Sequence, residues 1–132
     1  MIFIDTSAIC ALADRADPRH RVAKESLSRI LASGRSILTH NYVLVESMAL
    51  IQHRLGTKAA VQFAESASSF DVSWVDAKMH GQAIEQLIAS GRRQLSLVDH
   101  VSFVFMRSRG IDLAFAFDRD FDLAGFGLLE VD

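Results

Sequence analysis

Several residue types that define classes of protein are scarce in this chain of 132 residues. Its single cysteine, Cys10, excludes an internal disulfide framework and a cysteine-rich zinc site, and makes a reducing cytoplasm the expected setting. No apolar run approaches the roughly 20 residues that span a bilayer, so we expect no membrane segment. The formal net charge is −2, so the chain lacks the basic excess with which many proteins bind nucleic acid.

Linker sequence is scarce as well. The one proline is Pro18, and no repeat or stretch rich in glycine, serine and proline marks a domain boundary. Apolar residues are abundant instead, at 50% of the chain against 23% charged residues, which excludes a disordered tail. We therefore expect one globular domain over residues 1–132.

Short apolar runs alternate along the chain with longer segments of helical period. The runs predict strands at residues 2–4, 36–39, 71–75, 112–117 and 128–131. Helices are predicted at residues 7–13, from Pro18 to a stop at Gly34, and at 41–55, 57–69, 76–89, 96–109 and 121–124. Apolar strands separated by helices indicate an α/β fold, with a mostly parallel sheet of about five strands in three α/β/α layers.

Two of the predicted strands end on an acid, since Asp5 follows the first and Asp118 follows the fourth. In open parallel sheets, ligands gather at the carboxyl ends of the strands beside a switch in strand order, so both acids should project there. Asp99 lies in the first turn of the helix that leads into the Asp118 strand. Glu46 stands in an apolar helix with no lysine or arginine three or four residues away, so its charge needs a partner elsewhere.

A divalent cation would be such a partner for converging carboxylates. Two unit charges ~4 Å apart repel by about 4 kcal/mol at an effective dielectric of 20, and Mg²⁺ or Mn²⁺ reverses that energy. An all-carboxylate site without histidine is most consistent with hydrolysis of a phosphate ester. Each acid also has a structural alternative: a helix cap at Asp5, a favourable first-turn charge at Asp99, a solvated helix position at Glu46 and a turn acid at Asp118.

Four motifs resemble those of the PIN-domain ribonucleases, and most closely the VapC-type toxins of prokaryotic toxin–antitoxin pairs. They are Asp5-Thr6-Ser7 after the first strand, Glu46 in the helix after the second, Ser96-Leu97-Val98-Asp99 opening a late helix, and Phe117-Asp118-Arg119-Asp120-Phe121 after the fourth strand. The resemblance spans the whole chain, with the motifs in the family's order. It implies the PIN fold, which has a five-stranded parallel sheet.

The resemblance also implies a catalytic site whose acids bind Mg²⁺ or Mn²⁺, namely Asp5, Glu46, Asp99 and Asp118. It adds Asp120 as a candidate fifth metal-binding acid, and Thr6 and Ser96 as hydroxyls that support the site. One residue departs from the family pattern, because Ala116 stands where relatives often carry a threonine near the metal.

The implied activity is metal-dependent endonucleolytic hydrolysis of RNA by a toxin that an antitoxin protein silences. The family commonly forms homodimers, for which the apolar positions of helices 41–55 and 57–69 are candidates. One alternative is a PIN-like module that keeps the acids but only binds RNA or protein. Another is a phosphorylatable receiver domain, which requires a lysine after the fifth strand that this sequence does not supply.

Basic and aromatic residues complete the sequence-based predictions. The candidates for holding RNA phosphates are Arg15, Arg19, Arg92 and Arg93, with a scattered solvated surface as the alternative. The five histidines show no metal-ligand spacing and are predicted to lie on the surface or at an interface. Trp74 is predicted to belong to the core.

Overall fold

The computed structural model describes residues 1–129, which contain five strands and seven α-helices. The strands are β1 (Ile2–Ile4), β2 (Ile37–His40), β3 (Asp71–Ser73), β4 (Leu113–Phe115) and β5 (Gly127–Leu128). The helices are α1 (Thr6–Ala13), α2 (His20–Ser33), α3 (Asn41–Leu55), α4 (Thr57–Ser66), α5 (Ala77–Ser90), α6 (Leu97–Arg109) and α7 (Asp120–Leu123). A 3₁₀ turn, η1 (Ala67–Ser69), follows α4.

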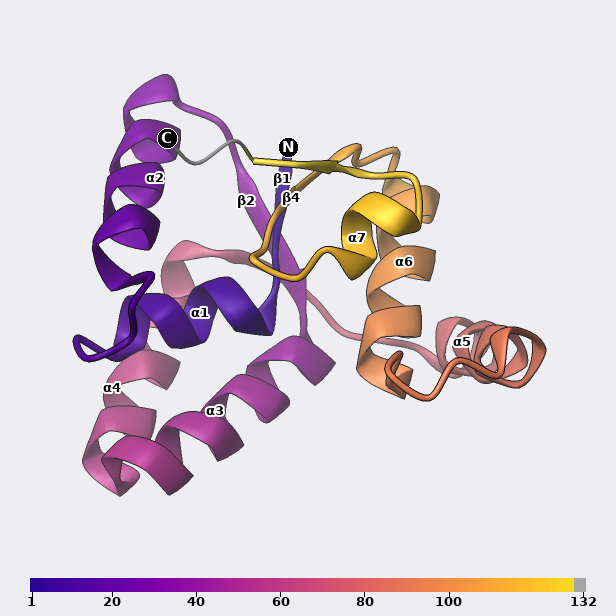
Figure 1. The fold of residues 1–132 in the computed structure, drawn as a ribbon, viewed down its shortest axis with the longest axis horizontal. Coiled ribbons are helices and arrows are strands. Elements are labelled where there is room, and N and C mark those ends of the chain that lie inside the picture. Colours follow the sequence, from indigo (N-terminus) through magenta and orange to yellow (C-terminus); the bar gives the residue numbers. More distant parts are fainter. Residues whose placement is uncertain (130–132) are drawn as a thin grey trace.

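All the strands pair in parallel, in the order β3-β2-β1-β4-β5. Helices α1, α2 and α4 lie on one side of the strands, and α5, α6 and α7 lie on the other (Figure 1). The predicted three-layer α/β class is therefore confirmed, with the whole sheet parallel. The chain builds outward from β1 through β2 to β3 and then places β4 on the other side of β1, so the strand order switches between β1 and β4.

The first strand lies at the centre of the core because it is apolar throughout and has a neighbouring strand on each side. Its residues, Ile2, Phe3 and Ile4, each expose 0% of their surface. The ring centroid of Phe3 lies 5.8 Å from that of Phe105 on α6 and 5.9 Å from that of Phe121 on α7. Burying one such side chain contributes about 1.5–3 kcal/mol, so the core holds the carboxyl end of β1 firmly in place.

The predicted helices and strands are present, but several ends differ. Strand β3 stops at Ser73 rather than at residue 75, because only residues 71–73 pair with β2. Strand β4 is shorter than the predicted 112–117, and the end of the predicted helix 57–69 forms η1 instead. Of the last predicted strand, Leu128 pairs with β4, whereas residues 130 and 131 lie outside the described part of the chain.

Two predictions about individual side chains are wrong. Trp74 is 80% exposed, because the strand ends one residue earlier and its alternation does not continue. His40 and His100 are buried rather than superficial, with 0% and 3% exposed. His40 caps α3 by accepting a hydrogen bond from the backbone N–H of Val43, and burial lowers its pKa to about 3, so it is neutral.

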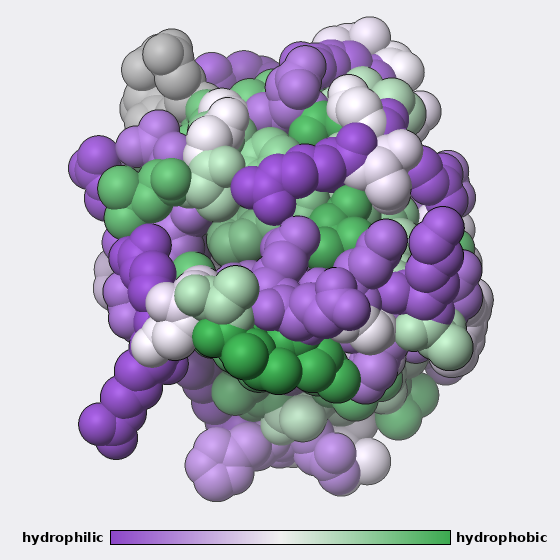
Figure 2. Space-filling view, turned by 90° about the vertical axis from the view of Figure 1, so that its right-hand side faces the viewer, coloured by the Kyte–Doolittle hydropathy of each residue, from purple (hydrophilic) through white to green (hydrophobic). Residues whose placement is uncertain are grey.

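The surface that carries α5 and α6 is mainly hydrophilic, with a band of apolar side chains across it (Figure 2). On α5 the exposed large apolar residues are Ile84 and Ile88, one helical turn apart and 36% and 76% exposed. None of the helices in residues 1–129 has the length and apolar character that crossing a membrane requires.

Candidate active site

A pocket of about 470 Å³, here called the acidic pocket, opens where the strand order switches. Asp5, directly after β1, and Asp118, after β4, both line it. The complete lining is Asp5, Thr6, Ser7, Cys10, Asp17, Arg19, Glu46, Leu50, Arg54, Gln94, Ser96, Asp99 and Asp118. Open parallel sheets bind their ligands at this kind of position, so the topology and the chemistry point to the same place.

Asp5 is fixed at the junction of β1 and α1. Its backbone N–H donates to the carbonyl of Phe115 on β4, at 3.1 Å. Its Oδ2 accepts from the backbone N–H and the hydroxyl of Ser7, at 3.3 and 3.0 Å. The same hydroxyl accepts from the backbone N–H of Phe117 at 3.0 Å. One serine therefore ties Asp5 to the segment that carries Asp118.

Asp99 enters the acidic pocket from the first turn of α6. The Ser96 hydroxyl accepts from the Asp99 backbone N–H at 3.3 Å, and Asp99 Oδ2 accepts from the Ser96 backbone N–H at 2.8 Å. The predicted capping box is therefore confirmed. Asp5 accepts the hydrogen bonds of Ser7, and Asp99 those of Ser96, through the Oδ2 atom.

Asp118 lies at the start of the short segment that leads into α7. Its Oδ1 accepts from the backbone N–H of Asp120 at 2.9 Å. Asp120 is not part of the pocket lining. Burial raises the pKa of Asp120, and its hydrogen bond to Asp118 and the charges of Asp118 and Asp99 raise it further. Asp120 therefore lies outside the pocket lining, but the charges of the pocket acids still affect its pKa.

The carboxylates of the acidic pocket act on one another. Burial raises the pKa of Asp5 to about 6; the Ser7 hydrogen bonds oppose this rise and the charge of Asp99 adds to it. Burial also raises the pKa of Asp99, and the charge of Asp118 contributes. The ion pairs within residues 1–129 join Arg21 to Glu25 and Arg119 to Asp122, so none of them neutralises a pocket acid.

A divalent cation suits this set of donors. Carboxylate oxygens are the ligands that Mg²⁺ and Mn²⁺ prefer. Thr6, 7% exposed in the wall of the pocket, has a hydroxyl without a hydrogen-bond partner in residues 1–129. No three His, Cys, Asp or Glu side chains in that range form a preformed metal cluster, so no three of the acids are gathered around one point. Repulsion between like charges is a physical reason for that separation.

Two arginines line the same pocket. The Arg19 backbone N–H donates to Asp17 Oδ1 at 2.8 Å, and its guanidinium carbon lies 5.2 Å from the centroid of the Phe117 ring. The contact with Phe117 places Arg19 beside the segment that carries Asp118. Arg54 lines the pocket from the last turn of α3, the helix that also carries Glu46.

The structure separates the sequence-predicted residues into two groups. Those that line the acidic pocket are Asp5, Thr6, Arg19, Glu46, Ser96, Asp99 and Asp118. Those outside the lining are Arg15, Arg92, Arg93 and Asp120. Sequence reasoning missed Ser7 as a link between strands, and it missed Arg54. The spacing of eight residues between Glu46 and Arg54 was the available signal, because it places both on one side of a helix.

Comparison with known proteins decides the family. The model of the PIN domain matches residues 2–127. The chain belongs to the PIN-domain family. Among curated PIN-domain relatives, the chain is 43% identical over 129 residues to the protein named 23S rRNA-specific endonuclease VapC20 of Mycobacterium tuberculosis, covering 96% of this chain and 95% of that one. The resemblance predicted from the motifs is therefore confirmed.

Solved structures agree with this PIN-domain assignment. The crystal structure of M. tuberculosis VapC20, described as a sarcin–ricin loop cleaving toxin, superposes with a TM-score of 0.85 at 40% identity, covering 96% of both chains. DNA-bound VapBC of Salmonella typhimurium gives a TM-score of 0.69 at 15% identity, covering 97% of this chain and 96% of that one. FitAcB of Neisseria gonorrhoeae gives 0.69 at 13% identity, covering 98% and 97%. The last two show the shared fold.

Proposed function

We propose that this PIN-domain protein is a divalent-metal-dependent endoribonuclease that acts as the toxin of a toxin–antitoxin pair. The observation that carries the proposal is the acidic pocket, in which Asp5, Glu46, Asp99 and Asp118 come from four separate segments to the switch point of the sheet. A relative 43% identical over almost the whole chain bears the name of an endonuclease, which supports the same activity here. A pure binding module would have no need for four unneutralised acids.

In this proposal Asp5, Asp99 and Asp118 hold Mg²⁺ or Mn²⁺, with Glu46 completing the acidic set. When bound, the cation lowers the pKa of water and stabilises negative charge on a phosphoryl oxygen. The chain positions its own acids for this task, because Ser7 orients the Asp5 carboxylate and Ser96 orients that of Asp99. Asp120, beside the pocket, is the candidate further metal-binding acid.

The proposed substrate is single-stranded or looped RNA, and within that class the large ribosomal RNA. The relative VapC20 is named as specific for 23S rRNA, and its crystal structure is described as that of a toxin that cleaves the sarcin–ricin loop. The alignment with VapC20, at 43% identity, covers 96% of this chain. Arg19 is the proposed phosphate contact nearest the site, since its guanidinium stacks on Phe117, the residue before Asp118. Arg15, Arg92 and Arg93 are proposed as weaker contacts outside the pocket.

Cleavage of RNA tests the proposed function directly. Purified wild type and Asp118→Asn are incubated with total cellular RNA and with a sarcin–ricin loop oligoribonucleotide, in Mg²⁺ and in EDTA. We expect discrete cleavage by wild type in Mg²⁺ alone. Equal cleavage by both proteins in all conditions would indicate a contaminating nuclease. RNA binding without cleavage by wild type in Mg²⁺ would favour the binding module instead.

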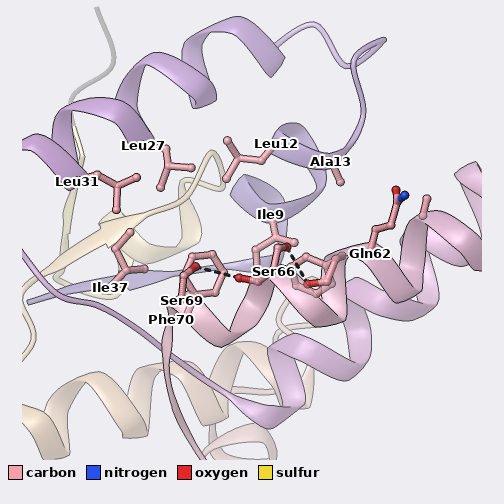
Figure 3. A pocket seen from close by; sticks show the side chains of 12 residues that line it. Ile9, Leu12, Ala13, Leu27, Leu31, Ile37, Gln62, Ser66, Ser69 and Phe70 are labelled. Carbon is pink, nitrogen blue, oxygen red and sulfur yellow. Dashed lines mark hydrogen bonds between the residues drawn. The ribbon is translucent and has the colours of Figure 1, made fainter.

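We further propose that the antitoxin binds a second hollow, here called the apolar groove. This groove of about 480 Å³ lies between α1, α2 and α4, and Figure 3 shows its side chains pointing into it from all three helices and from β2. Its lining is Ile9, Leu12, Ala13, Leu27, Leu31, Ile37, Ala59, Gln62, Phe63, Ser66, Ser69 and Phe70. An amphipathic segment of a partner protein is the occupant that such a groove accepts, through apolar anchors at helical spacing.

The homodimer remains a proposal. Helices α3 and α4 expose three large apolar side chains, Val45 at 66%, Leu55 at 42% and Val61 at 47%. A second copy of the chain would cover these side chains. They lie on the two helices whose apolar positions the sequence analysis named as candidates for the dimer interface. Light scattering on wild type and Val45→Asp tests this, and a monomeric mass for wild type at micromolar concentration would contradict it.

A further inference from the structure

The acidic pocket extends along two helices rather than ending at its carboxylates. On α3 it is lined by Glu46, Leu50 and Arg54, which are spaced four residues apart and so share one face of the helix. On α1 it is lined by Thr6, Ser7 and Cys10, and the first and last of these are also four residues apart. Because α1 packs against α3, these residues form one continuous wall, here called the α1–α3 channel. Two helical turns separate Glu46 from Arg54, about 12 Å along the axis.

The chemistry of the α1–α3 channel changes along its length. It begins at the acids Asp5 and Glu46, passes the buried Cys10 thiol and the half-buried Leu50, and reaches the exposed Arg54. The charges at both ends of the channel affect the pKa of the Cys10 thiol. Burial raises this pKa, the charge of Arg54 opposes the rise, and the charges of Glu46 and Asp5 add to it. An acidic start, an apolar middle and a cationic end match the order of groups along a nucleotide bound next to a metal-held phosphate.

Arg54 makes no ion pair within residues 1–129, although five acids line the same pocket. Its place in the last turn of α3 has a plain structural explanation, because a cation stabilises the carboxyl end of a helix. That explanation accounts for a positive residue there but not for its presence in the wall of the active-site pocket. His53, next to it in the same turn, does not line the pocket.

We propose that the α1–α3 channel holds the nucleotide next to the scissile phosphate, with Arg54 binding that nucleotide's phosphate and Leu50 and Cys10 contacting its sugar or base. This rests on the proposed ribonuclease function and adds a substrate subsite to it. Because Arg54 lies two helical turns beyond Glu46 on α3, we place its phosphate contact beyond the phosphate held by the carboxylates. It therefore acts on binding and register of the RNA strand and leaves the chemical step to the acids.

Steady-state cleavage of a sarcin–ricin loop oligoribonucleotide tests the role of Arg54 in the reaction. We expect Arg54→Ala to raise KM about tenfold with kcat within twofold of wild type, since a hydrogen bond to a charged group contributes about 1.5–3 kcal/mol. Arg54→Lys should recover part of the loss. Arg29→Ala removes an equally exposed arginine on α2 outside the acidic pocket and should leave KM unchanged. An unchanged KM for Arg54→Ala, or an equal rise for Arg29→Ala, overturns the proposal.

A binding measurement separates failure of this subsite from failure of the ribonuclease activity. Fluorescence anisotropy records the Kd of a labelled 12-nucleotide oligouridylate for Asp118→Asn alone and with Arg54→Ala, from 50 to 300 mM salt. Loss of one phosphate contact should weaken binding and reduce the salt slope by about 0.7. Identical slopes would overturn the proposal even where wild type cleaves RNA. A reduced slope would support it even where wild type does not cleave.

Discussion

Two hollows of nearly equal size, about 470 and 480 Å³, are both lined by the same eight-residue helix, α1. Helix α1 gives Thr6, Ser7 and Cys10 to the acidic pocket, and Ile9, Leu12 and Ala13 to the apolar groove. Successive side chains of a helix point about 100° apart, so one short helix can line two hollows of different chemistry.

The comparison shows that each hollow is unfavourable for the isolated chain, in a different way. The acidic pocket holds several carboxylates, none of which forms an ion pair within residues 1–129. These carboxylates therefore repel one another. The apolar groove keeps a side chain such as Leu31 61% exposed to water. A cation relieves the first cost and an apolar partner relieves the second. Variants that affect one hollow and spare the other therefore test the comparison.

The largest effect should come from Asp99→Asn. Removing one of the proposed cation-binding charges should lower RNA cleavage at least about 100-fold, since even groups that only support a metal ligand change activity 10–100-fold. Binding of the coexpressed antitoxin should not change. Cleavage rates and calorimetric titration measure the two properties. Asp76→Asn is the matched control, because Asp76 also caps a helix but lies outside the pocket; an equal loss in that variant would contradict the assignment.

Asp5→Asn should stabilise the protein in EDTA at neutral pH. The folded-state pKa of Asp5 is about 6 against an ordinary 3.8, so the folded protein holds this proton more tightly and its stability falls as pH rises from about 4 to about 6. That shift corresponds to about 3 kcal/mol, as an upper bound. Asparagine keeps the helix cap and removes the charge. Urea denaturation at pH 4 and pH 7 measures the free energy of unfolding of both proteins. If the variant loses as much stability between the two pH values as wild type does, Asp5 is not the cause of the loss.

Divalent cations should stabilise the wild type. Mn²⁺ at 100 times its Kd should add about 2.7 kcal/mol to the free energy of unfolding, because it binds the folded state only. Asp5→Asn and Asp99→Asn should each lose most of this gain, whereas Leu31→Asp should retain it. Melting temperatures with and without Mn²⁺ give the result. The same gain in all four proteins would mean that the cation binds outside the acidic pocket.

Leu31→Asp should weaken antitoxin binding while cleavage continues at the wild-type rate. Because Leu31 lines the apolar groove and is largely exposed, the new charge meets the partner rather than the core. We expect Kd to rise about 30-fold, the loss of one apolar anchor of about 2 kcal/mol. Ile88→Asp is the matched control, because Ile88 on α5 is 76% exposed and lies outside the apolar groove. A similar rise in Kd for the control would place the partner elsewhere.

The smallest effect should come from Ser7→Ala. The variant loses the hydroxyl that joins Asp5 to Phe117 and leaves the Phe117 N–H without its acceptor, which costs about 1–3 kcal/mol. Cleavage should fall through kcat, because the Asp5 carboxylate loses its orientation. Ser69→Ala, whose hydroxyl donates only to a nearby carbonyl, should change neither property. Chemical denaturation and single-turnover rates measure both effects.

Local patterns were sufficient to predict most of the fold. Apolar runs fixed the strands, and caps such as Ser96 fixed helix starts, because these signals act within a few residues. Trp74 and His40 were misjudged because burial depends on neighbours from distant segments: the strand stops before Trp74, and His40 finds a buried partner in Ser102 on α6.

The candidate site was predictable where the residue type itself was informative. Asp5 and Asp118 stood at strand ends, and Glu46 was conspicuous in an apolar helix. Ser7 was not, because its role depends on a backbone N–H 110 residues later in the chain. Arg54 needed the knowledge that α3 borders the pocket along two turns, which helical spacing suggests but does not establish.

The strand order determines how much of the chain must be synthesised before the acidic pocket can form. A ribosome that has completed the chain as far as α6 has already made Asp5, Glu46 and Asp99, but not β4, the neighbour of β1, nor Asp118. Domains generally fold as units, and the acidic pocket includes Asp118, so the pocket is completed only after β4 has been made and docks beside β1. Under the proposed function, a nascent chain should therefore leave the RNA around it uncut until synthesis is nearly finished.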